Sequence, residues 1–266
     1  MLPLVLAASC HGYHHLPCLL DIARSGVQVP LTNQVPQRTV HPANHGRPTI
    51  DTRFFSKTYR RDAWRCIVVD ADILDIWPEV HISPFGVVDT GNGDPRASRR
   101  VIDDLSYPPN GSVNDYTDQS AIYQPRYEHC DKIAGGITRQ RSRFPDPEVK
   151  QRTGDVASPY RHICVHSQSV HLFGGRLPQD IALVVDLSAA FGWGGSSGSY
   201  AVVGETISFS HGHTTNSFNP DGFFSYHWAD DHINVAADVE TNCEDVAWAL
   251  RLAVMTLLGP TAISED

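Results

Sequence analysis

The sequence has no apolar run near the roughly 20 residues that a membrane-spanning helix requires. Residues 1–10 are apolar, but they lack the basic segment that opens a signal peptide, and His11 follows at once. We therefore expect an intracellular protein, cytoplasmic or nuclear, without a membrane partner. A small secreted domain that uses residues 1–10 is the alternative.

Cysteine pairs with the C-x2-C spacing of zinc sites are absent too. Reduced and mostly buried thiols are the expected state, which suits an intracellular protein. The six cysteines are Cys10, Cys18, Cys66, Cys130, Cys164 and Cys243.

Basic residues are few: 21 Lys and Arg stand against 30 Asp and Glu, so the formal net charge is -9. This balance argues against non-specific nucleic-acid binding by the chain as a whole, because phosphate contacts need clustered Lys and Arg. Two local clusters are present, at residues 96–100 and 139–152, and each is either a solvated face or a local basic groove.

Turn-forming residues are abundant, with 20 glycines and 18 prolines in a chain long enough for a sizeable core. We therefore expect a loop-rich α+β fold. Prolines recur through residues 19–61 and predict an extended connector rather than long helices or ladder strands.

Hydrophobic periodicity predicts the main elements. Strands are expected at 66–69, in short pieces through 156–173, and along the apolar run 181–187. Helices are expected at 127–143 and at the C-terminal end, where Thr241 and Glu244 have the spacing of a capping box. Residues 200–207 suit either a helix or a strand.

The segment Phe224–Val235 carries two adjacent carboxylates, Asp230 and Asp231, between aromatic and β-branched residues. Such a pattern predicts two short strands joined by a tight turn. Adjacent carboxylates repel each other, so a divalent cation is one explanation for the pair. The other is that turns favour Asp, which caps its own backbone.

A third carboxylate is needed for a two-metal site of the kind that phosphoryl-transfer enzymes use. Asp155 is the best candidate because it lies where extended structure begins and has an aromatic residue, Tyr160, five residues later.

Taken in order, these segments resemble motifs A, B and C of reverse transcriptases. Asp155 with Tyr160 is similar to motif A, the turn Phe191–Ser196 to motif B, and Trp228–Asp231 to motif C. The specificity of the resemblance lies in the ordered set rather than in any one motif.

The segment Arg100–Pro108, together with Ser112–Asp115, resembles the fingers motif of retrotransposon polymerases, most closely those of the tyrosine-recombinase (DIRS-like) class. The whole resemblance covers roughly residues 60–260. It implies a right-hand polymerase architecture, with a fingers-like subdomain at 61–150 and a palm-like subdomain at 151–266. The proline-rich extended connector would precede them as an N-terminal segment at 1–60. The palm would be a ferredoxin-like antiparallel sheet with helices on one face. Because the sequence ends at Asp266, no thumb is expected.

The resemblance implies an RNA-directed DNA polymerase that extends a DNA primer on an RNA template. Asp155, Asp230 and Asp231 would be the catalytic and metal-binding residues and would hold two Mg²⁺ or Mn²⁺ ions, with Asp231 the more peripheral ligand. Deoxynucleoside triphosphates would be the substrates. The oligomeric state is not predicted.

Arg100, Tyr160, Gly192, Gly195 and Ser196 would bind the nucleotide. By resemblance, the Arg100 guanidinium would pair with the triphosphate. Tyr160 would crowd a ribose 2′-hydroxyl and so favour deoxynucleotides; a core tyrosine beside a strand is the alternative. The glycines would let the backbone approach the templating base pair.

Two residues depart from the family pattern. Pro159 removes a backbone N–H just before the aromatic residue of motif A, and Ser197 stands where the family usually has proline. They motivate the alternative of a catalytically inactive, degenerate or domesticated palm-fold fragment that binds nucleic acid or protein.

The 14 histidines also suggest zinc, with His211, His213 and the stretch from His227 to His232 as the best cluster. The competing interpretation is that His232 packs or hydrogen-bonds in the turn and that the other histidines lie at the surface.

Overall fold

A computed structural model describes residues 1–38, 40–45, 65–89, 99–177 and 180–263. The chain is a mixed α+β protein that divides into two compact units, each built from several stretches of sequence. Unit 1 comprises residues 1–24, 123–162 and 197–266, and unit 2 comprises residues 25–122 and 163–196. The predicted subdomains 1–60, 61–150 and 151–266 were each one continuous stretch of sequence. The two observed units are not continuous, because each is built from separate segments of the chain.

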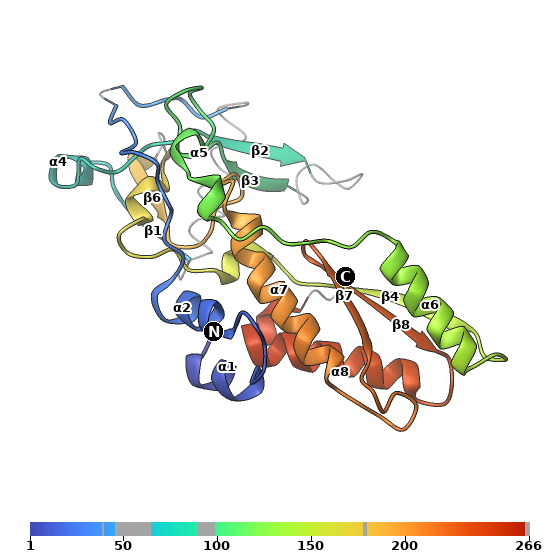
Figure 1. Cartoon of the computed structure of the whole chain (residues 1–266). Coiled ribbons are helices and arrows are strands. Elements are labelled where there is room, and N and C mark those ends of the chain that lie inside the picture. The colour runs from blue at the N-terminus through green and yellow to red at the C-terminus, as the bar shows by residue number, and fades with distance from the viewer. Residues whose placement is uncertain (39, 46–64, 90–98, 178–179, 264–266) are drawn as a thin grey trace. The chain divides into compact units, whose positions relative to one another are not determined.

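Unit 1 contains a three-stranded antiparallel sheet in the order β4-β8-β7 (Figure 1). Its strands are β4 (Val149–Asp155), β7 (Phe224–Trp228) and β8 (Asp231–Ala237). Its helices are α1 (Pro3–Ser9), α2 (Leu16–Ser25), α6 (Asp131–Arg143), α7 (Ser196–Gly212) and α8 (Asn242–Leu258). Only the end residues Ser25 of α2 and Ser196 of α7 are assigned to unit 2.

Helices α7 and α8 cover one face of this sheet. Leu250 of α8 lies so close to Gly154 of β4 that a Cβ there would be 2.5 Å from its Cδ2 atom. In the same way, Gly204 of α7 leaves room for the ring of His227 in β7. Since side chains alternate between the faces of a strand, positions 154, 227 and 232 share this helix-covered face.

Helix α6 packs against the other face of the sheet, where Gly136 gives space to the Phe224 ring. It covers the end of the sheet near Phe224 and the buried Val235. The opposite end of this face, at Trp228 and Asp231, is exposed. The palm-like sheet was expected to carry helices on one face, whereas the structure has helices on both faces, with one corner of the α6 side left open.

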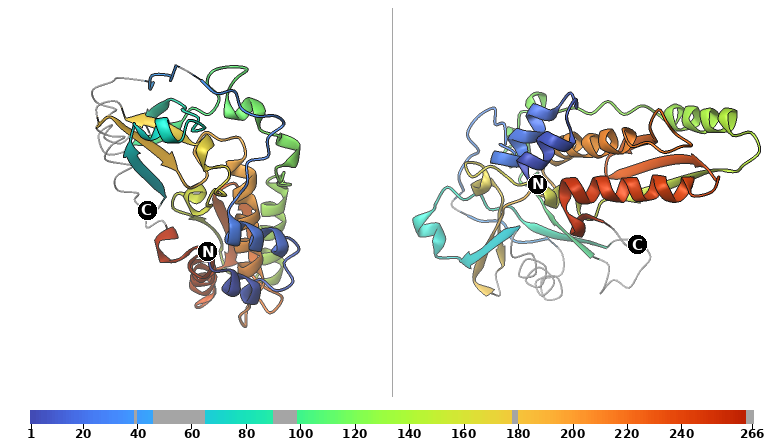
Figure 2. Two further views of the ribbon diagram at one scale, coloured as in Figure 1. Left: turned by 90° about the vertical axis from the view of Figure 1, so that its left-hand side faces the viewer. Right: turned by 90° about the horizontal axis from the view of Figure 1, so that it is seen from below.

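The short helices α1 and α2 lie beside α7 (Figures 1 and 2). Tyr13, in the connection between them, donates a hydrogen bond to the carbonyl of Val202 in α7 at 3.0 Å. This N-terminal segment was expected to be part of an extended connector, and that expectation was wrong for residues 3–25. The prolines that motivated it begin only at Pro30, apart from Pro3 and Pro17 near the helix starts, where proline is tolerated.

Unit 2 contains a three-stranded antiparallel sheet, β1-β6-β5, and a separate pair, β2-β3. The strands are β1 (Cys66–Asp70), β2 (Phe85–Asp89), β3 (Arg99–Asp103), β5 (Gly174–Leu177) and β6 (Ala182–Asp186), and the short helices are α4 (Ile73–Ile76) and α5 (Val113–Tyr116).

Strand β6 is buried along its whole length because alternate residues enter two different core clusters. Ala182 and Val184 pack with Phe85, and Leu183 and Val185 pack with Val80 and Ile82. A continuous apolar run is the pattern that such a strand requires.

Several predicted elements are confirmed and others are not. The strands at 66–69 and 181–187, the helix at 127–143 and the C-terminal helix are present. Between 156 and 173 the structure has 3-10 turns (Pro159–His162 and Val170–Leu172) and isolated bridges rather than a series of strands. The capping box at Thr241 does not form: the Thr241 hydroxyl accepts no hydrogen bond from the helix backbone and instead donates to the Asp245 carboxylate.

The cysteines were expected to be mostly buried, and this was wrong. Cys10 and Cys66 are buried, Cys243 is partly buried, and Cys18, Cys130 and Cys164 are exposed.

Among the described residues, none of the helices combines the length and the apolar character needed to cross a bilayer.

Candidate functional site

The hairpin β7-β8 turns through only two residues, Ala229 and Asp230. Ala229 has a φ of 53°, as the first central residue of a two-residue hairpin turn requires. A positive φ costs energy in a residue other than glycine. The buried His227 holds it in place, because its ring Nε2–H donates to the Ala229 carbonyl. Asp230 therefore sits at the tip, and Asp231 is the first residue of β8.

Asp155 ends strand β4 directly opposite Asp231 in the antiparallel ladder. Directly opposed positions of such a pair lie on the same face of a sheet, with Cβ atoms about 4.5–5.5 Å apart. The side chain of Asp155 itself lies outside what the structure describes. The backbone register nonetheless brings Asp155 to the same corner of the sheet as Asp230 and Asp231, which follow it by 75 and 76 residues in the sequence.

The carboxylate of Asp231 is in an unfavourable environment. Partial burial raises its pKa, and the neighbouring charge of Asp230 raises it further. Like charges at opposed positions of a sheet destabilise it. A cation would relieve this repulsion, and carboxylate oxygens are the ligands that Mg²⁺ prefers. The donor set at this corner therefore fits the predicted metal.

An aromatic group borders the aspartate corner. Trp228, which pairs with Asp231 across the hairpin, stacks on Tyr127 with ring centroids 4.9 Å apart. Tyr226 lies on the same face and its hydroxyl donates to the carbonyl of Glu128. Trp228 is 42% exposed, so one edge of the corner is a flat aromatic surface open to solvent.

Tyr160 lies in the 3-10 turn Pro159–His162 that follows β4. Its ring packs edge-on against Tyr200 of α7, with centroids 6.0 Å apart. Ser158, just before the turn, has a φ of 52°, and Pro159 supplies no N–H to it. The packing on Tyr200 is what the alternative of a core tyrosine predicts, although Tyr160 is only half-buried.

Asn114 joins two of the sequence motifs within unit 2. Its side-chain amide donates to Ser106 Oγ at 2.9 Å and to the Gly192 carbonyl at 2.8 Å, while its oxygen accepts from the Gly194 N–H at 2.8 Å. The fingers-like segment and the glycine-rich turn, about 80 residues apart, are therefore locked together. This role of Asn114 was not predicted, because sequence order alone does not show which loops meet.

The predicted nucleotide-binding residues of the glycine-rich turn have structural roles in unit 2. A Cβ at Gly192 would overlap the Asp103 carbonyl oxygen, at 1.9 Å, and a Cβ at Gly195 would meet the Trp193 ring. The Ser196 hydroxyl is buried and donates to the Ala190 carbonyl at 2.7 Å. Packing thus accounts for these residue types without a nucleotide.

Arg100 occupies a position in β3 paired with Val88, and its side chain lies outside the described part of the structure. The second basic cluster is better described. Arg139, Arg141 and Arg143 are exposed on α6, where Arg143 approaches Asp221 at 3.9 Å. Lys150 on β4 pairs with Asp238.

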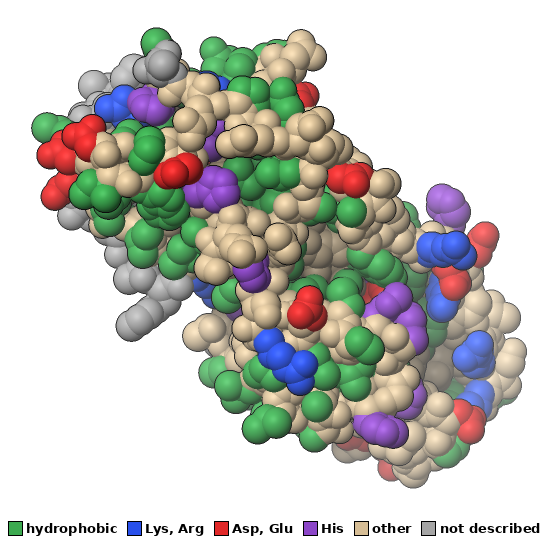
Figure 3. All heavy atoms as spheres, turned by 60° about the vertical axis from the view of Figure 1, so that its left-hand side comes forward, with side chains coloured by type: hydrophobic (Ala, Val, Ile, Leu, Met, Phe, Trp, Pro, Cys, Tyr) green, Lys and Arg blue, Asp and Glu red, His purple; other side chains and the backbone are tan. Residues whose placement is uncertain are grey.

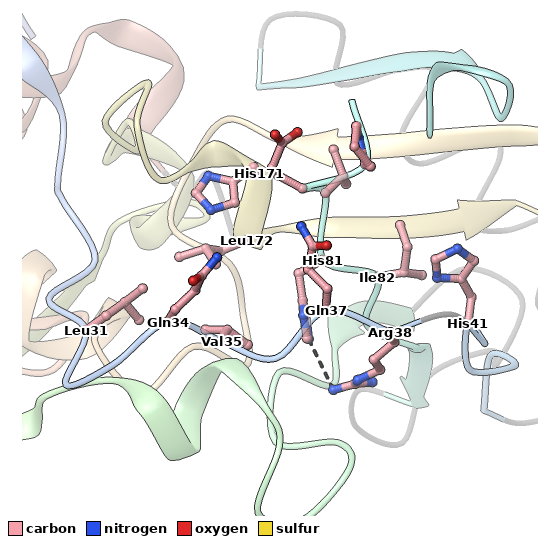
Figure 4. A pocket seen from close by; sticks show the side chains of 13 residues that line it. Leu31, Gln34, Val35, Gln37, Arg38, His41, His81, Ile82, His171 and Leu172 are labelled. Carbon is pink, nitrogen blue, oxygen red and sulfur yellow. Dashed lines mark hydrogen bonds between the residues drawn. The ribbon is translucent and has the colours of Figure 1, made fainter. Parts of the chain in front are cut away.

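Unit 2 also has a cavity of about 90 Å³ (Figure 4). Arg38 Nη2 lies 3.1 Å from His81 Nε2 there, and 2.8 Å from the Gly111 carbonyl. Burial and the Arg38 charge lower the pKa of His81 to about 4, so its ring is neutral and accepts this hydrogen bond. Because Arg38 is occupied in joining chain segments, we assign the cavity a structural role.

The predicted zinc cluster does not form: among the described residues, no three of these histidines bring their ring nitrogens within 4.8 Å of one another. His213 is exposed and bonds to its own helix, through the Phe209 carbonyl. His211, His227 and His232 are buried, and the first two use Nε2–H to donate to the Val246 and Ala229 carbonyls. The competing expectation for His232 is confirmed, since it packs beneath the turn and bonds to Ser208. The expectation that the remaining histidines lie at the surface was wrong for His211, His227 and His81.

Comparison of the sequence with family models and with curated proteins gives no match. The arrangement of the residues therefore carries the functional argument.

Proposed function

We propose that unit 1 is the palm of a reverse transcriptase of the DIRS-like class, an RNA-directed DNA polymerase. The observation that carries the proposal is the register of β4 with β8, which sets Asp155 opposite Asp231 beside the Asp230 turn. This is the relation that motifs A and C of the resemblance require. Antiparallel strands backed by α7 and α8 further support it.

In this proposal Asp155, Asp230 and Asp231 hold Mg²⁺ or Mn²⁺. The metal, when bound, supplies charge neutralisation and lowers the pKa of an attacking hydroxyl. The chain positions these carboxylates through the rigid ladder, and His227 fixes the turn by its bond to Ala229. Partial burial and the Asp230 charge raise the pKa of Asp231, and a bound cation would oppose this shift by favouring the carboxylate form.

The face of the sheet that carries the corner suits a nucleic-acid substrate. Exposed arginines on α6, which packs on the same face of the sheet, offer partners for phosphates. The exposed ring of Trp228 offers a stacking surface for a base. Deoxynucleoside triphosphates, a DNA primer and an RNA template are the proposed ligands, and the nucleotide roles of Arg100, Tyr160, Gly192, Gly195 and Ser196 stay predictions.

Primer extension tests the proposal. The full chain is given a DNA primer annealed to an RNA template, all four deoxynucleotides, and Mg²⁺ or Mn²⁺. Extension is expected, and Asp230→Asn should reduce it by at least about 100-fold because a metal ligand is lost. The matched control is Asp221→Asn, an aspartate of the same unit whose side chain is 94% exposed; it should extend like the unaltered chain.

Equal extension by Asp230→Asn and the unaltered chain would contradict the assigned site. Absence of extension with both metals would support the second candidate, a catalytically inactive palm-fold fragment that binds nucleic acid or protein. Two observations favour that candidate: Pro159 in the turn after β4, and the exposed apolar side chains of Trp248 and Leu252 on α8.

A further inference from the structure

A cluster of metal-ligating side chains lies at the surface of unit 1, apart from the aspartate hairpin. It consists of His14, His15 and Glu205, whose nearest ligand atoms all lie within 4.8 Å of one another. The two histidines are in the connection between α1 and α2, and Glu205 is in α7. We propose that these three residues bind a divalent transition-metal ion of the zinc class.

The connection between α1 and α2 is anchored so that both histidines face α7. Tyr13, the residue before them, is buried and bonds to the Val202 carbonyl, one helical turn before Glu205. The rings of His14 and His15 lie 4.0 Å apart between centroids. His15 also packs edge-on against Tyr123, at 4.8 Å. The histidines are thus held by aromatic neighbours rather than free in solvent.

Glu205 is oriented by the phenol of Tyr123, and the hydroxyl of Tyr13 lies nearby. Tyr123 donates to its carboxylate, with oxygen distances of 2.8 and 3.0 Å, and the Tyr13 hydroxyl lies 3.3 Å from Oε2. Two hydroxyl hydrogens occupy at most two of the roughly four lone-pair sites of a carboxylate. At least two sites are therefore available to an ion. Burial, with the hydrogen bond to Glu205 as the next cause, raises the pKa of Tyr123 to about 12, so the phenol stays a donor.

The ligand set indicates the class of metal. Two imidazoles and one carboxylate form the three-ligand set of many zinc sites and of some iron sites, with further positions left for water or another ligand. Mg²⁺ prefers all-oxygen coordination, so this set discriminates against the metal proposed for the aspartate corner. Hydrogen bonds to a ligating carboxylate are a common outer layer of metal sites. His14 is exposed, which gives an ion a path of entry; exposed histidines are coloured purple in Figure 3.

We did not predict this site from the sequence. The zinc cluster predicted there consisted of His211, His213, His227 and His232. An adjacent His-His pair was visible at positions 14 and 15. Its partner on α7 was not, because 190 residues separate them. The proposal does not depend on the polymerase function, and either can fail without the other.

Metal titration of the full chain tests the proposal. The protein is first stripped of metal with a chelator. One sample is then titrated with Zn²⁺ by calorimetry, and a separate sample is titrated with Co²⁺ by visible spectroscopy. One ion per chain is expected at this site. His15→Ala and Glu205→Gln should each weaken binding by about 100-fold or more, and Tyr123→Phe by about 10-fold, as the loss of an outer partner does. Glu205→Gln keeps an acceptor for the phenols, and circular dichroism checks that each variant is folded.

The matched control is His11→Ala, an exposed histidine of the same connection that lies outside the cluster; it should bind as the unaltered chain does. Three results would overturn the proposal. One is the absence of Zn²⁺ and Co²⁺ binding. Another is unchanged affinity in folded His15→Ala and Glu205→Gln. The last is a thiolate-to-cobalt charge-transfer band, which would place the ion on an exposed cysteine such as Cys18.

Discussion

Three buried histidines lie beneath the aspartate hairpin, and their charge state affects the stability of unit 1. His211 and His232 are fully buried and His227 nearly so. Burial lowers the pKa of His232 to about 3 and that of His211 to about 4, and it lowers that of His227 as well. His232 Nε2 has no hydrogen-bond partner among the described residues, so a proton there would not be stabilised.

The pH dependence follows from these pKa values. The ordinary histidine pKa is about 6.5, above the folded values, so the unfolded chain binds more protons between them. Stability is therefore full above about pH 6.5 and falls as the pH drops toward the folded pKa values. For His232 alone, the loss between pH 7 and pH 5 is about 2 kcal/mol.

His232→Gln should accordingly reduce the difference in unfolding free energy between pH 7 and pH 5 by about 2 kcal/mol. Urea unfolding at the two pH values measures this difference. His129→Gln, at an exposed position of the same unit, is the control and should leave the difference unchanged. An unchanged difference in His232→Gln would show that His232 is not the group that titrates.

At the scale of elements, helix α6 depends on one of two adjacent glycines. Gly136 faces the sheet, and a Cβ there would lie 2.6 Å from the Phe224 ring. Gly135 faces solvent, and a Cβ there would meet no atom within 4 Å. Glycine is therefore required at position 136 by close packing. At position 135 it has no packing role and only weakens the helix.

Gly135→Ala should stabilise the protein by about 0.5–1 kcal/mol, because alanine has the higher helix propensity and restricts the unfolded chain. Gly136→Ala should destabilise it, because the methyl group displaces Phe224 and with it the contact of α6 with β7. Chemical denaturation of the two variants gives both signs in one experiment. Stabilisation by Gly136→Ala would contradict the packing of α6 described above.

Elements with a clear hydrophobic periodicity could be predicted from the sequence. Elements whose residues are buried by tertiary contacts on several sides, or from irregular backbone, could not. The C-terminal helix has one buried stripe and was predicted. Helix α7 is buried along several sides, through Tyr200, Val203 and Ile207 among others, so no single apolar stripe distinguished a helix from a strand. The series of strands expected at 156–173 failed because apolar residues there are buried from irregular backbone.

At the scale of the whole molecule, the residues of the resemblance divide between the two units. Asp155, Tyr160 and the hairpin aspartates belong to unit 1, and Arg100 with the glycine-rich turn belongs to unit 2. Within each unit the structure joins motifs that are distant in sequence: β4 to the hairpin, and Asn114 to Gly192. The order of the motifs could be predicted from sequence. The resemblance also implies that the strand of motif A lies beside the hairpin of motif C, and β4 does pair with β8. The contact of Asn114 with Gly192 could not be predicted, because local sequence does not encode which distant loops meet.

The proposed metal corner can be located directly by adding Mn²⁺ to isotopically labelled full-length protein and measuring paramagnetic broadening of the backbone amide resonances. Broadening is predicted to be strongest around residues 154–156 and 229–232, and to be lost there in Asp230→Asn. Broadening confined to residues near His14 and His15 would assign Mn²⁺ to the other site. That result, or broadening at the hairpin that survives Asp230→Asn, would contradict a metal site formed by Asp155, Asp230 and Asp231.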